Sequence, residues 1–119
     1  MARQIIAKQV PYGPYPTLPV AANALDLVET AADVTNKEEF APSGDDLVIV
    51  HNTGASPYTV TFTSVPDEMK RTGDVPAYSL GAGELASFRF KKQGWLQTDG
   101  NIYIEASNAA VKWAVIQLV

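Results

Sequence analysis

Two neighbouring stretches decide the fold: Leu47-Val48-Ile49-Val50-His51 and Tyr58-Thr59-Val60-Thr61-Phe62-Thr63. The first is a run of mostly β-branched residues, and the second alternates apolar residues with threonine. Alternation with a period of two is typical of a strand that buries one face. Because the turn-forming residues 52–56 lie between the stretches, the sequence predicts a hairpin in which Tyr58, Val60 and Phe62 point inward.

Further short strands are expected on both sides of this hairpin. Phe62 and Trp113 are predicted core residues because each lies on the apolar face of an alternating segment. Residues 33–43 are polar and are expected to form a loop with room for one helical turn at residues 36–40. The other expected strands are residues 3–10, 24–30, 75–80, 84–90, 101–106 and 111–119. About eight short strands and no long helix predict an all-β fold, an antiparallel β-sandwich that is jelly-roll-like.

The N-terminal segment, residues 1–22, is expected to be a strand followed by an extended proline-rich arm, and residues 23–119 are expected to form the β-sandwich domain. Four of the eight prolines lie between Pro11 and Pro19. Each proline fixes its own φ and favours an extended residue before it, so this stretch cannot join a central strand. The arm either packs as a strap on its own domain or contacts a neighbouring subunit.

Composition limits the possible functions. The chain has 119 residues, 46% of them hydrophobic, which fits one packed domain. Nine Lys and Arg against thirteen Asp and Glu give a net charge of −4, which argues against binding nucleic acid through its phosphates. The absence of cysteine excludes disulfides, thiol catalysis and cysteine-based metal sites. No apolar run predicts a membrane span or a signal peptide, so we expect synthesis in a cytoplasm.

No motif predicts an enzyme, a metal site or a cofactor. His51 is the single histidine, and no Gly-x-Ser-x-Gly elbow supplies a nucleophile for it. Gly81-Ala82-Gly83 lacks the third glycine and the following helix of a phosphate-binding loop, so it is expected to be a hairpin turn. The carboxylates of residues 45–46, 67–68 and 99 lack the spacing of a calcium loop.

The aromatic side chains leave two readings open. They could form a stacking platform for sugars, or they could belong to the core and to a subunit interface. The residues concerned are Tyr12, Tyr15, Tyr78, Trp95 and Tyr103.

From Leu47 onward the order of features resembles the capsid decoration, or cement, proteins of tailed bacteriophages, which are small β-sandwiches. The resemblance covers about two-thirds of the chain and does not include the loop at residues 33–43. It is carried by Asn52-Thr53-Gly54, Tyr58-Thr59-Val60-Thr61-Phe62, Arg71-Thr72-Gly73-Asp74, Gly94-Trp95-Leu96-Gln97-Thr98-Asp99-Gly100 and the ending from Ala106 to Leu118.

The resemblance implies a virion structural protein that binds the outer surface of an assembled capsid. Such a protein bridges neighbouring copies of the major capsid protein and acts as a homo-oligomer, a dimer or trimer, at a capsid symmetry axis. It needs no catalytic residue, cofactor, nucleic acid or membrane. The stiff arm and the loops near residues 70 and 95 are the expected contact surfaces, and the candidate interface residues are Tyr12, Pro14, Tyr15, Leu18, Lys70, Arg71 and Trp95.

Two other functions remain open from the sequence. A β-sandwich with exposed loops and aromatic side chains can be a carbohydrate- or receptor-binding module. A head-to-tail joining protein would belong to the same virion but would contact a ring and not the shell.

Overall fold

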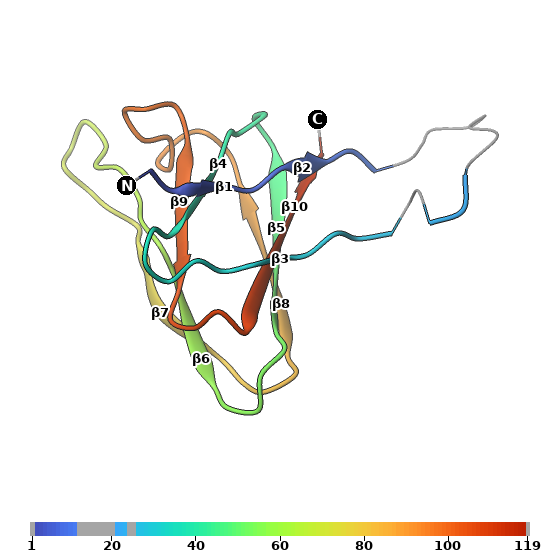
Figure 1. Ribbon diagram of the computed structural model, residues 1–119. Helices are drawn as coiled ribbons and strands as arrows, with labels where there is room; N and C mark the ends of the chain where they lie inside the picture. Colours follow the sequence, from blue (N-terminus) through green and yellow to red (C-terminus); the bar gives the residue numbers. More distant parts are fainter. Residues whose placement is uncertain (1, 12–20, 24–25, 119) are drawn as a thin grey trace.

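The computed structural model describes residues 2–11, 21–23 and 26–118, and within these residues the chain forms ten strands and no helix (Figure 1). The prediction of an all-β fold is therefore confirmed. None of the described residues forms a helix that could span a membrane. In chain order the strands are β1 (Gln4–Ile5), β2 (Lys8–Gln9), β3 (Thr30–Ala31), β4 (Glu38–Phe40), β5 (Asp46–Asn52), β6 (Tyr58–Phe62), β7 (Val75–Leu80), β8 (Leu85–Phe90), β9 (Ile102–Ala106) and β10 (Val111–Gln117).

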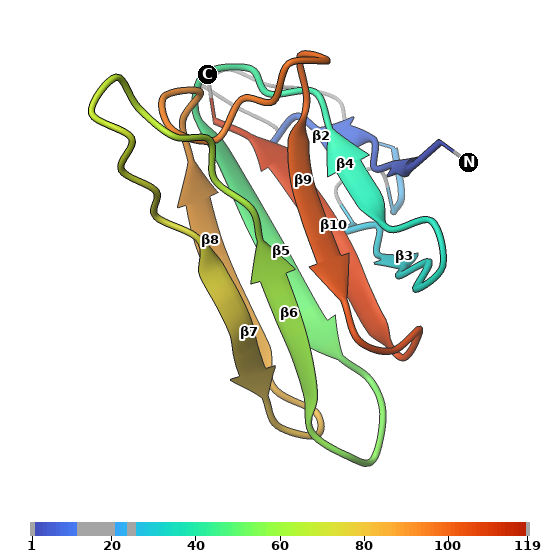
Figure 2. The ribbon, with the colours of Figure 1, turned by 90° about the vertical axis from the view of Figure 1, so that its left-hand side faces the viewer.

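The described strands form two sheets that pack face to face as a sandwich (Figure 2). One sheet has the order β1-β4-β9-β6-β7, and the other has the order β2-β10-β5-β8, with β3 also paired to β10. Strands β3 to β10 pair antiparallel. Strand β1 pairs parallel with β4, and β2 pairs parallel with β10. Both sheets are therefore mixed, and the expectation of a purely antiparallel sandwich is wrong for the N-terminal strands.

The apolar faces of the long strands meet between the sheets. Phe62 and Trp113 are fully buried and lie edge to face with ring centroids 5.8 Å apart, so their prediction as core residues is confirmed. The inward set on β6 is also confirmed, since Val60 and Phe62 are buried and Tyr58 is half-buried against the core. Alternation therefore identified which face of these strands is inside.

The predicted hairpin of residues 47–63 is wrong, because β5 and β6 lie in different sheets. The reason is visible at Asn52, which is fully buried at the end of β5. Its side-chain amide donates to the carbonyl oxygens of Ser56 (2.8 Å) and Leu80 (2.9 Å), and Leu80 ends β7 in the opposite sheet. The turn is thereby fastened across the end of the sandwich. The turn at residues 81–84 likewise connects β7 to β8 across the sheets, so it is no hairpin turn either.

The N-terminal third differs most from expectation. Residues 3–10 form two two-residue strands in opposite sheets, and Ile6 between them is buried in the core. The predicted strand at residues 24–30 is wrong for its described part, because β3 begins only at Thr30 and both Leu27 and Val28 are exposed. The predicted loop at residues 33–43 contains β4, so the helical turn expected at residues 36–40 is wrong.

Strand β4 is held by a buried carboxylate. Glu38 is fully buried, and its Oε1 accepts a hydrogen bond from the indole Nε1 of Trp113 at 2.9 Å, while Oε2 accepts one from the backbone N–H of Asp33. The guanidinium of Arg3 donates to the carbonyl oxygen of Glu38 at 2.9 Å. Burial raises the pKa of Glu38 above its ordinary value. These contacts explain how a segment without apolar alternation becomes an internal strand.

Candidate functional site

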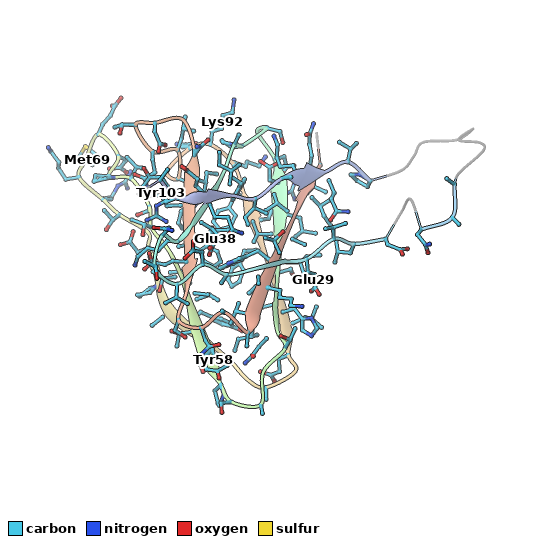
Figure 3. All side chains as sticks on the ribbon, in the orientation of Figure 1. Glu29, Glu38, Tyr58, Met69, Lys92 and Tyr103 are labelled. Atoms are coloured by element: carbon cyan, nitrogen blue, oxygen red, sulfur yellow. The ribbon has the colours of Figure 1, made fainter. Side chains whose placement is uncertain are left out.

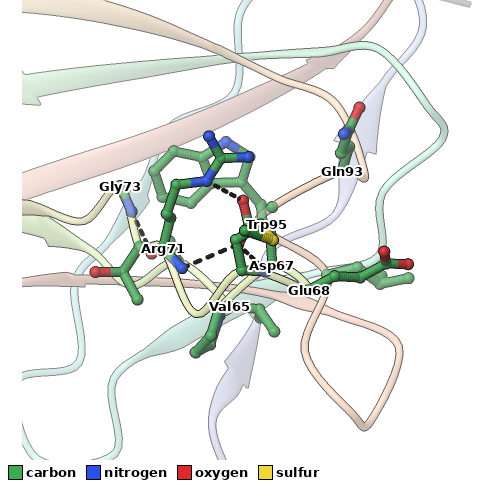
Figure 4. Close-up of a pocket in the computed structure, with 13 residues that line it drawn as sticks. Val65, Asp67, Glu68, Arg71, Gly73, Gln93 and Trp95 are labelled. Atoms are coloured by element: carbon green, nitrogen blue, oxygen red, sulfur yellow. Dashed lines mark hydrogen bonds and ion pairs between the residues drawn. The ribbon is translucent and has the colours of Figure 1, made fainter.

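Two loops at one end of the sandwich enclose an open groove of about 770 Å³ (Figure 4). One loop, residues 63–74, connects β6 to β7, and the other, residues 91–101, connects β8 to β9. The backbone N–H of Val65 donates to the carbonyl oxygen of Gly94 at 2.7 Å, and the side-chain amide of Gln97 donates to the carbonyl oxygen of Thr63 at 3.1 Å. The loops are therefore bonded to each other at the base of the groove.

Asp74 closes the base of the first loop. Its Oδ1 accepts hydrogen bonds from the backbone N–H of Ser64 at 2.7 Å and from the Ser64 hydroxyl at 2.6 Å. The hydroxyl oxygen of Ser64 in turn accepts from the N–H of Gly73 at 2.8 Å. Hydrogen bonds from Ser64 lower the pKa of Asp74, because they stabilise its charged form.

Asp67 shapes the tip of the same loop. Its Oδ1 accepts from the backbone N–H groups of Met69 (2.8 Å) and Arg71 (2.9 Å), and its Oδ2 accepts from the Arg71 Nε at 2.7 Å. The backbone hydrogen bond from Arg71 is the main reason that the pKa of Asp67 is lowered. Lys70 adopts a left-handed conformation with φ of 63° in this tight turn. The tip is thus a structured turn in which one carboxylate binds two of the residues that follow it.

The groove combines apolar and charged side chains. Trp95 is half-buried and packs edge to face on Phe90 of β8, with ring centroids 4.9 Å apart. Met69, with 74% of its surface exposed, and Leu96, with 38%, also line the groove. Figure 3 shows Met69 at the outer tip of its loop, far from the buried Glu38. Exposed large apolar side chains beside ordered polar groups are typical of a recognition surface.

The described residues include ionisable side chains in this groove, namely Asp67, Glu68 and Arg71, and others elsewhere on the sandwich. They contain no cluster of three or more His, Asp or Glu side chains able to hold a metal ion. Among the carboxylates considered from the sequence, Asp45 binds Arg89, Asp67 binds Arg71, and Asp99 binds the hydroxyl of Tyr103. His51 contacts Glu29, with 3.1 Å between Nδ1 and Oε2.

Sequence reasoning located part of this groove. Arg71 and Trp95, two of the candidate interface residues, line it together, and Lys70 lies in the same turn without lining it. Tyr12, Pro14, Tyr15 and Leu18 lie outside the described residues. Met69 and Asp67 were missed. Their signals were a large apolar side chain within a polar loop and an aspartate that begins a turn.

The aromatic residues do not form one platform among the described residues. Tyr78 on β7 lies edge to face on Phe88 of β8. Tyr103 on β9 lies under the guanidinium of Arg3, which is 4.0 Å from the ring centre. Trp95 is the one of these three that lines the groove. Among the described aromatic residues, a stacking platform for sugars in this groove would therefore consist of the Trp95 ring alone.

The fold and the groove define an all-β sandwich domain with an open groove at one end. Comparison with protein-family models, with curated proteins and with solved structures finds no match for this chain.

Proposed function

We propose that this protein is a bacteriophage virion structural protein that binds the outer surface of the capsid and bridges neighbouring copies of the major capsid protein. The groove between residues 63–74 and 91–101 is the proposed contact surface. The observation that carries the proposal is that exposed Met69 and Leu96 line a groove whose loops are held in place by hydrogen bonds. A contact surface that is ordered before binding loses little entropy when a partner docks.

The jelly-roll form of the sandwich is part of the same proposal. Its support is the nesting of the antiparallel pairs: β6 with β7, β5 with β8, β4 with β9, and β3 with β10. This is the pairing of one long hairpin wound around a two-sheet sandwich, with the loop at residues 63–74 at its tip. Jelly rolls are common among viral shell proteins and lectins.

Charge supports the choice of partner. The net charge of −4 disfavours phosphate binding, so an outer position away from packaged DNA fits better than an inner one. We place the protein on the capsid surface after synthesis in the host cytoplasm, as a homo-oligomer, a dimer or trimer at a symmetry axis. The proline-rich arm, whose residues 12–20 lie outside the described ones, is proposed as a second contact. No enzymatic activity, cofactor, nucleic acid or membrane is part of the proposal.

The test is co-sedimentation of the purified protein with empty shells of the phage that encodes it. We expect saturable binding with a stoichiometry set by the shell symmetry, and cryo-electron microscopy should place the protein outside. Absence of binding to intact shells, with binding to isolated portal or neck rings, would identify a head-to-tail joining protein instead.

Carbohydrate or receptor binding is the second candidate. The observation that favours it is the position of Trp95 in a groove also lined by Asp67, Arg71 and Gln93. An aromatic ring beside hydrogen-bonding side chains suits the apolar and hydroxyl faces of a sugar. A glycan array run in parallel separates the candidates: selective glycan binding without shell binding would replace the capsid proposal.

A further inference from the structure

Strand β8 has a free edge along the side of the sandwich, next to β7 (Figure 2). It pairs with β5 on one side, and no described strand pairs with its other side. Leu85, Ser87 and Arg89 of β8 are exposed, and Ala86 and Phe88 are half-buried. A six-residue edge without proline offers its unpaired backbone groups to another strand.

The alternation of hydrogen-bonded residues along β5 determines which backbone groups of β8 remain free. The N–H of Asn52 donates to the carbonyl oxygen of Glu84, while the N–H of Thr53 donates to Ala110. In an antiparallel ladder the bonded residues alternate, so the even-numbered residues of β5 bond β8 and the odd-numbered residues bond β10. By the observed register, Ala86, Phe88 and Phe90 face β5. The N–H and C=O groups of Leu85, Ser87 and Arg89 therefore point to the free edge.

The neighbouring edge on β7 is built differently. It contains Pro76, and Ala77 has a positive φ of 48°, with its N–H bonded to the hydroxyl oxygen of Thr61. The pairing of β6 with β7 also shifts register between Val60 and Phe62. Proline and irregular backbone are devices that prevent edge pairing. The remaining edge strands among the described residues, β1, β2 and β3, have two residues each.

We propose that β8 pairs antiparallel with β8 of a second copy, which forms a two-fold symmetric dimer with one sheet continuous across both chains. The free groups are symmetric about Ser87, so an antiparallel register centred there pairs Ser87 with Ser87, and Leu85 with Arg89, of the other copy. Every free N–H and C=O of Leu85, Ser87 and Arg89 then has a partner. This inference does not depend on the groove or on its proposed ligand.

The charges and sizes of the β8 side chains favour a second copy of this chain as the partner strand. Arg89 already binds Asp45, with Nε 2.7 Å from Oδ1, so the edge approaches its copy with that charge compensated. The two-fold register places Arg89 beside Leu85 and keeps the two Arg89 side chains apart. On the inner face it sets Phe88 opposite the smaller Ala86. No pair of like charges lies directly across this register.

The experiment measures mass by light scattering and sedimentation from micromolar to millimolar protein. The wild-type chain should dimerise, and Ser87→Lys should raise the dimer dissociation constant by about a hundredfold or more, because two like charges then meet at the axis. Ser79→Lys, an exposed serine on the neighbouring edge strand β7, is the matched control and should leave the dimer unchanged. Trp95→Ala should also leave it unchanged, which separates this test from the test of the groove.

A second measurement uses the unmodified protein. Amide exchange followed by NMR should show Leu85, Ser87 and Arg89 slowing as the concentration rises, while Ala86 and Phe88 are protected throughout. A wild-type monomer at all concentrations overturns the proposal. A dimer that persists in Ser87→Lys also overturns it, whatever the effect of Ser79→Lys.

Discussion

The interior of the sandwich and the groove at its end are held together by different interactions. In the interior, Phe62 and Trp113 have no exposed surface, and every buried side-chain N or O atom of the described residues has a hydrogen-bond partner. In the groove, Met69 and Leu96 stay exposed, and Asp67 and Asp74 hold the loop of residues 63–74 that carries Met69. The loop of residues 63–74 is therefore shaped mainly by its own hydrogen bonds, whereas the loop of residues 91–101 also packs Trp95 on the core residue Phe90.

This difference shows that the buried core and the shape of the 63–74 loop depend on separate residues. Burial between the sheets supplies most of the folding free energy, whereas carboxylate hydrogen bonds set the loop shape. Substitutions in the two regions should accordingly change different measurements.

The largest effect is expected in the interior. Phe62→Ala removes a fully buried ring that contacts Phe88, Phe90 and Trp113, and should lower the free energy of unfolding by about 3–5 kcal/mol. Urea denaturation measures this. Thr59→Ala on the same strand is the control and should stay within about 0.5 kcal/mol. Equal losses in both variants would show that β6 does not have one buried face.

A somewhat smaller effect is expected at the buried carboxylate. Glu38→Ala leaves the Trp113 indole N–H and the Asp33 backbone N–H without an acceptor, which should cost about 2–4 kcal/mol. Glu105→Gln, on a partly exposed ion pair with Lys37, should cost about 1 kcal/mol or less. A Glu38→Ala loss as small as that of Glu105→Gln would mean that β4 is held by its backbone pairing alone.

The raised pKa of Glu38 predicts a smaller, pH-dependent effect. Because the folded state holds this proton more tightly than the unfolded state, the contribution is full below the unfolded pKa of about 4.3 and is lost as pH rises through the folded pKa. The stability of the wild type relative to Glu38→Gln should therefore fall as pH rises from the unfolded pKa to the folded pKa and then level off. Urea titrations at several pH values measure the difference. A difference that grows with pH would contradict the assigned burial.

The smallest effect on global stability is expected at the base of the groove. Asp74→Ala removes the acceptor for Ser64, so the amides of Ser64 and Gly73 should exchange faster with only a minor change in the unfolding midpoint. Because the pKa of Asp74 is lowered, the same loosening should occur in the wild type as pH falls through that pKa. Exchange rates measured by NMR test both. Glu68→Ala, exposed on the same loop, should leave them unchanged.

Local patterns in the sequence predicted the long strands and their inward faces. Val60, Phe62 and Trp113 could be assigned to the core because alternation reports which face is buried. The pairing of strands was not predictable in this way, since the same turn residues can close a hairpin or cross between sheets. The decisive group there is the side chain of Asn52, whose partner at Leu80 is 28 residues away.

The candidate site was predictable only in part for a similar reason. Arg71 and Trp95 are 24 residues apart in the sequence, and the loops that carry them meet through the Val65 to Gly94 hydrogen bond. Strand β4 was missed because Glu38 is a charged residue at a core position. Hydrogen bonds from the Trp113 indole and the Asp33 backbone compensate the burial of its carboxylate. Long-range hydrogen bonds of this kind leave no periodic signal in a single sequence.

The central claim is that the groove, and not the sandwich body, contacts the shell. Binding of Met69→Ala and of Trp95→Ala to empty shells tests it directly, with Val28→Ala, 65% exposed before β3, as the control. Each groove variant should keep a cooperative unfolding transition and bind more than about tenfold more weakly, equivalent to about 1.4 kcal/mol, while Val28→Ala binds as the wild type does. Unchanged binding by both folded groove variants would contradict the account.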